Sequence, residues 1–126
     1  MNRLLVALCI FLLAAGFVGV HTYKVVALSR DVDEICGRIE EDFEKENWDG
    51  ISQNTQKLEE RWKESRFWAS LTIDTKKIEE IEISLKQSAK YAELQAKPDF
   101  MGEFIMFKML TEHLPHQEGF DIKELL

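Results

Sequence analysis

The chain has 126 residues, 45% of them hydrophobic, and its 16 Lys and Arg against 23 Asp and Glu give a formal net charge of -7. This length suits one domain with a modest hydrophobic core. The acidic balance argues against nucleic acid as a partner, because phosphate binding needs a cationic face. The only two cysteines, Cys9 and Cys36, lie too far apart along a helical sequence to form one disulfide.

An uninterrupted apolar run without one charged or amide side chain occupies residues 4–20, and three further residues extend it to a polar edge at Lys24. Twenty helical residues rise about 30 Å, the thickness of a hydrocarbon core. We therefore expect residues 4–23 to contact the lipid bilayer. Residues 1–23 form a membrane anchor in this interpretation, and residues 24–126 form an acidic helical-bundle domain.

A cleaved signal peptide is the alternative to a retained anchor. Arg3 gives the run a short positive start, and the small residues 14–16 resemble a cleavage site. The apolar run continues past Gly16 without a polar segment, which favours a signal anchor. The flanking charges are nearly balanced, with a marginal bias at Arg3. We expect a single-pass protein of the cell membrane with an extracytoplasmic C-terminal domain.

Beyond Lys24 the apolar residues recur at spacings of three and four, which is typical of amphipathic helices. The first helix continues from the anchor to about Asn47, and Asp49 is the candidate N-cap of the second. A third helix follows Asp74, and a fourth runs from Pro98 to about Leu114. Short connections make neighbours antiparallel. The predicted fold is all-α: an N-terminal transmembrane helix continuous with a stem, packed into an antiparallel bundle of about four helices.

The fourth helix carries more apolar surface than one face of a bundle needs. One stripe, which includes Phe104 and Phe107, is expected to enter the core. A second stripe of Met101, Ile105 and Met109 is the candidate partner face. It needs cover from the C-terminal tail, from lipid headgroups or from another protein. Two further aromatic residues, Trp62 and Trp68, are candidate core anchors, with ligand stacking as their alternative role.

Metal-like spacing occurs only at His113-x-x-His116, where Pro115 interrupts the helical geometry that would aim both rings at one ion. No zinc-protease motif, phosphate loop or nucleophile elbow is present in the sequence. We expect no catalytic residues, no metal site, no cofactor and no enzymatic activity.

A family resemblance rests on a tryptophan spacing and on an acid-isoleucine helix. The segment Trp48–Leu58 precedes Trp62 and Trp68, and residues 73–82 read IDTKKIEEIE before a proline-stopped EHLP at residues 112–115. With the N-terminal apolar run, this pattern resembles the uncharacterised family called domain of unknown function 4363. The resemblance implies a small membrane-anchored helical protein of Gram-positive, often spore-forming bacteria, with no assigned activity and with a membrane-protein partner.

Two functions compete at this point. The first is a non-catalytic interaction or scaffold module that acts with a membrane-protein partner or by self-association, which needs an outward apolar patch. The alternative is an extracytoplasmic sensor or binding domain for a small ligand or ion, which needs a pocket with convergent polar groups. A ligand of the folded state must raise the melting temperature, so a thermal-shift screen separates the two.

Overall fold

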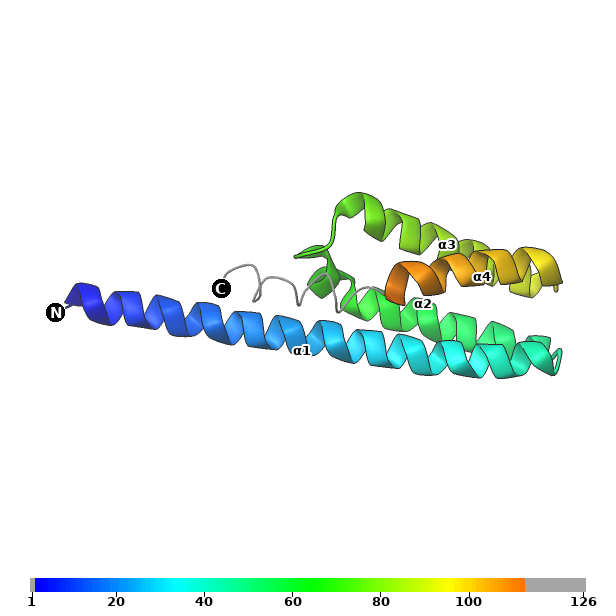
Figure 1. Cartoon of the computed structure of the whole chain (residues 1–126), viewed down its shortest axis with the longest axis horizontal. Helices are drawn as coiled ribbons and strands as arrows, with labels where there is room; N and C mark the ends of the chain where they lie inside the picture. Colours follow the sequence, from blue (N-terminus) through cyan, green and yellow to red (C-terminus); the bar gives the residue numbers. More distant parts are fainter. Residues whose placement is uncertain (1, 113–126) are drawn as a thin grey trace.

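The computed structural model describes residues 2–112, and every regular element in that range is a helix. The helices are α1 (Asn2–Glu44), α2 (Trp48–Ser70), α3 (Thr75–Glu93) and α4 (Lys97–Glu112). At 43 residues, α1 is about 65 Å long. Most of its first half extends beyond the other described helices, and its second half packs into a bundle with them (Figure 1). The predicted all-α architecture is confirmed.

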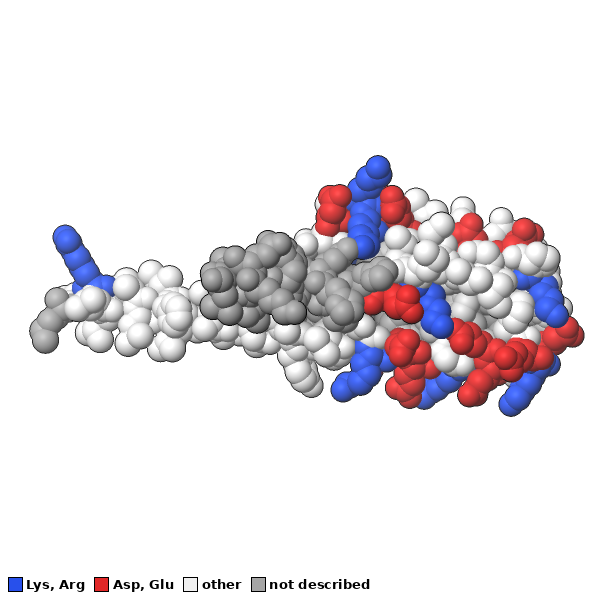
Figure 2. Space-filling view, viewed as in Figure 1, with Lys and Arg blue, Asp and Glu red and all other residues white. Residues whose placement is uncertain are grey.

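The free half of α1 is the most apolar part of the molecule. Among the described residues, α1 is the one helix long and apolar enough to cross a membrane. Its large side chains between Leu4 and Val20 are exposed, and residues 4–20 carry no charge. Most of the projecting part of the molecule is white in Figure 2. Such a surface is compatible with membrane anchoring, because exposing it to water costs roughly 25 cal/mol per Å² and lipid removes that cost.

In the bundle, α1 and α2 run antiparallel, which can be followed through their side-chain contacts. His21 meets Trp68, Asp31 meets Arg61, and Asp42 meets Asn54. The helices α3 and α4 form a second close pair, α2 packs on α3, and α1 has its narrowest contact with α4. The four helices therefore form a ring in which α1 and α4 make the least contact.

Each helix buries the stripe that its apolar spacing predicts. The core includes Trp62, Phe104 and Phe107, all of which are buried. Trp68 differs from the expectation: it is half-buried and lies outside the core cluster. Its ring packs instead on Phe17 and His21 of α1, because the end of α2 reaches the part of α1 where the projecting half joins the bundle. The rest of the described core consists of Val25, Leu28, Val32, Cys36, Ile39, Ile51, Leu58, Ala69, Ile73, Ile78, Ile81, Leu85, Ala92 and Phe100.

The third helix begins after Asp74 as expected, whereas other helix ends differ from the sequence expectation by one to three residues. The N-cap of α2 is Asn47, not Asp49, and its side-chain oxygen accepts the Gly50 N–H at 3.2 Å. The earlier cap results because α1 ends at Glu44 in a left-handed turn with Glu46 at φ 54°. The last described residue of α4 is Glu112, so the expected helix end at Leu114 lies outside the described residues.

Candidate functional site

The side of the bundle between α1 and α4 has the least contact between neighbouring helices. Two adjoining hollows follow it, with volumes of about 610 and 430 Å³. The larger hollow has an apolar wall, made of Phe43, Met101, Phe104, Ile105 and Met109. The smaller hollow is more polar, and its lining includes Arg30, Asp33, Cys36, Lys108, Thr111 and Glu112 beside Val26 and Val32. We call the two together the α1–α4 seam.

The three residues of the candidate partner face all line the apolar half of this seam. Met101 is half-buried and packs against the core, whereas Ile105 and Met109 are 48% and 56% exposed. Their spacing of four keeps them on one stripe of α4, while Phe104 and Phe107 turn inward. The stripe seen in the sequence therefore forms one edge of the seam, and Met101 is its most buried residue.

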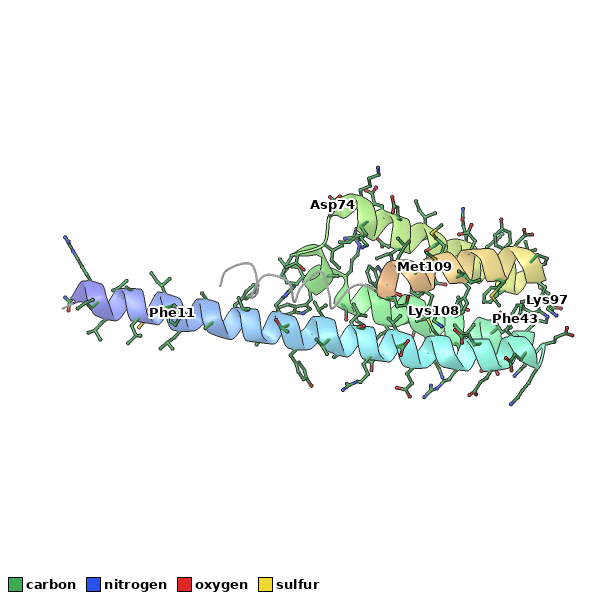
Figure 3. All side chains as sticks on the ribbon, viewed as in Figure 1. Phe11, Phe43, Asp74, Lys97, Lys108 and Met109 are labelled. Atoms are coloured by element: carbon green, nitrogen blue, oxygen red, sulfur yellow. The ribbon has the colours of Figure 1, made fainter. Side chains whose placement is uncertain are left out.

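An ion pair crosses the seam where its apolar and polar halves meet. Lys108 Nζ on α4 donates to Glu40 Oε1 on α1, and Figure 3 shows Lys108 directed toward α1. That hydrogen bond raises the pKa of Lys108 against the opposing effect of burial, so the ammonium stays charged at neutral pH.

At the far end of the seam Lys97 Nζ lies 2.8 Å from Glu46 Oε1 and 5.6 Å from the Phe43 ring centroid. Pairs as exposed as these are screened by water and salt. They align α4 with α1 without closing the contact tightly.

Cys36 faces the polar half of the seam but is not a reactive thiol. Burial raises its pKa from 9.0 to about 12, and nearby Lys108 offsets only part of that effect. The thiolate is the reactive form, so a rise of this size lowers its fraction at neutral pH about a thousandfold. The side chain therefore serves as a small core residue.

We expect a thiol reagent to label Cys36 slowly in the folded protein and rapidly in denaturant. The measurement is the rate of labelling at neutral pH in a Cys9→Ser variant of the full chain. Gln56 is exposed on the bundle, so a Gln56→Cys variant in a Cys9→Ser, Cys36→Ala background supplies the matched accessible thiol. Equal rates for Cys36 in the native and the denatured chain would contradict its burial.

The remaining candidate site residues are the possible metal ligands His113 and His116 and the acidic side chains. Residues 2–112 contain no group of three or more His, Cys, Asp or Glu side chains placed to hold a metal ion. His113 and His116 lie outside the described residues. The carboxylates of α1 mostly form an exposed surface, visible in red along the lower edge of the bundle in Figure 2.

The contact between the end of α2 and the projecting half of α1 was missed by the sequence reasoning. His21 Nε2 lies 2.8 Å from the carbonyl oxygen of Trp68, and Phe67 packs edge-on against Trp68. A carbonyl can only accept, so the ring nitrogen donates. A histidine at the end of an apolar run was the available signal, but its partner is 47 residues away.

The sequence matches, over residues 20–125, the family described as domain of unknown function (DUF4363). The chain belongs to this family. The DUF4363 match covers the whole bundle and begins where the apolar run ends, so residues 2–19 of α1 precede it. No curated protein and no solved structure matches the chain. The α1–α4 seam lies entirely within the DUF4363 region.

Proposed function

We propose that this DUF4363 protein is a membrane-anchored, non-catalytic interaction module. The apolar half of α1 holds the protein in the cell membrane as a single-pass anchor, with the bundle on the extracytoplasmic side. The bundle binds a membrane-protein partner along the α1–α4 seam. The observation that carries the proposal is the apolar half of the seam, where Ile105 and Met109 lie exposed beside a hollow of about 610 Å³.

The lining of the seam favours a particular kind of partner. Apolar side chains form its floor, and methionine thioethers adapt to the shape of a bound surface. Three carboxylates and one ammonium group surround that floor: Glu40, which is paired with Lys108, and Glu44 and Glu112. An amphipathic helix with Lys or Arg beside its apolar stripe complements both features, in the helix-in-groove mode of recognition.

We expect Ile105→Gln with Met109→Gln to leave the melting temperature nearly unchanged but to reduce partner capture at least about tenfold, because two exposed apolar contacts are lost. The measurement is the amount of membrane protein that copurifies with the full-length chain in mild detergent. Ile83→Gln with Leu94→Gln is the matched control, since both side chains are exposed on the α3 side of the bundle, away from the seam. Met101 is left unchanged because it packs against the core.

Undiminished capture by the seam variant would contradict the proposal. A dimer that becomes a monomer in the same variant, with no other protein captured, would replace the partner by a second copy of the chain. Cover by the C-terminal segment is tested by truncation after Glu112. If the C-terminal segment covers the seam, the truncation and the seam variant lower the melting temperature equally, and their combination lowers it no further.

A further inference from the structure

A second exposed apolar surface lies at the end of the bundle that faces the projecting half of α1. It consists of Phe67, Trp68 and Leu71, which we call the proximal cluster. Phe67 is 62% exposed and Leu71 43% exposed, although the neighbouring Ala69 and Ile73 are buried. Three adjacent large apolar side chains at a helix end would be poorly placed in water.

Contacts with α1 fix the height of this cluster along the anchor. The Trp68 ring centroid is 6.0 Å from that of Phe17 and 6.3 Å from that of His21. Phe17 lies within the apolar run, three residues before its end at Val20 and six before Tyr23. At 1.5 Å per residue, Phe17 is about 5–9 Å inside the apolar boundary. An anchor that spans the hydrocarbon core therefore brings Trp68 to the membrane surface or below it.

The last backbone carbonyl groups of α2 accept hydrogen bonds within the protein, as surroundings with little water require. Helix ends leave carbonyl oxygens without intrahelical partners, which is costly next to lipid. Here the Phe67 oxygen accepts the Ser70 hydroxyl at 2.7 Å, and the Trp68 oxygen accepts His21 at 2.8 Å. The Ala69 oxygen accepts the Ile73 N–H at 3.0 Å.

The two ends of the bundle also differ in the charge of their residues. Residues 61–77, around the proximal cluster, hold five Lys or Arg and two Asp or Glu, and two of the basic residues, Arg61 and Arg66, are paired with Asp31 and Glu82. Residues 40–49, at the opposite end of the bundle, hold one Lys and six Asp or Glu. Phosphate headgroups attract the first end and repel the second.

We propose that the proximal cluster is a second membrane contact, which inserts into the headgroup and acyl boundary of the bilayer that holds α1. Tryptophan is enriched at this depth because one side of its ring is apolar and the other carries an N–H donor. The contact holds the bundle against the membrane in one orientation. It rests on the anchor of the proposed function, but not on the partner.

The test places an environment-sensitive fluorophore on single cysteines of the full chain, in a Cys9→Ala, Cys36→Ala background. The protein is reconstituted into vesicles of phosphatidylcholine and phosphatidylglycerol that contain a nitroxide lipid quencher. Phe67→Cys reports on the cluster. Gln56→Cys is its matched control, because it lies on nearly the same face of α2, about 16 Å farther from the anchor. Phe11→Cys reports on the anchor itself.

A nitroxide near the headgroup is expected to remove most of the fluorescence at position 67 and little of it at position 56. A nitroxide at the end of the acyl chain is expected to quench position 11. If position 11 is quenched while positions 67 and 56 behave alike, the second contact is wrong and the anchor stands. If position 11 is not quenched, the anchor fails and this inference fails with it.

Discussion

Replacing Phe100 by alanine is expected to lower the free energy of unfolding by about 3–5 kcal/mol, the usual cost of removing a buried phenylalanine. Phe100 has no exposed surface and lies where α1, α2 and α4 meet. Its ring centroid is 6.0 Å from those of Phe43 and Trp48 and 5.6 Å from that of Phe104. No one of these neighbours can fill the space alone, because each is fixed by its own helix.

The loss is measured by urea unfolding of the full chain in detergent, followed by helicity. Met106→Ala on the same helix is the control, since that side chain is 51% exposed and its removal leaves no cavity. Its expected cost is below about 1 kcal/mol. A cost for Phe100→Ala no larger than that of the control would show that α4 does not pack against the end of α1.

Placing arginine at both Phe11 and Ala15 is expected to abolish retention in the membrane. Each arginine at the centre of a membrane helix costs about 2.5–3.5 kcal/mol on the insertion scale, so the pair costs about 5–7 kcal/mol. Both positions are exposed in the middle of the apolar half of α1, where none of the other described helices covers the charge. Phe11→Leu with Ala15→Leu keeps the run apolar and is the matched control.

The measurement is the share of the protein in the membrane pellet after an alkaline wash. The unmodified chain and the leucine control are expected in the pellet, and the arginine variant in the supernatant. A pelleted arginine variant would mean that another part of the chain holds the membrane. Intact mass of the retained protein completes the test, because cleavage near Gly16 would remove most of the anchor.

Local periodicity was sufficient for most of the fold. A helix sets side-chain direction every 3.6 residues, so the spacing of three and four placed Phe104, Phe107 and Trp62 in the core without knowledge of their neighbours. The uncharged run before Lys24 likewise indicated a helix suited to lipid, because length and polarity are properties of the segment alone.

Properties that depend on two distant segments were decided only by the tertiary structure. The distance between α1 and α4 decides which part of the apolar stripe on α4 is covered. Met101 therefore packs against the core, while Ile105 lies at the open seam. Trp68 was expected in the core on its bulk alone. Because α2 is long, Trp68 lies instead at the end of the bundle, where it contacts Phe17 and His21. No local pattern encodes that contact, because it is set by where the turn after α1 ends and by the register in which two antiparallel helices pack.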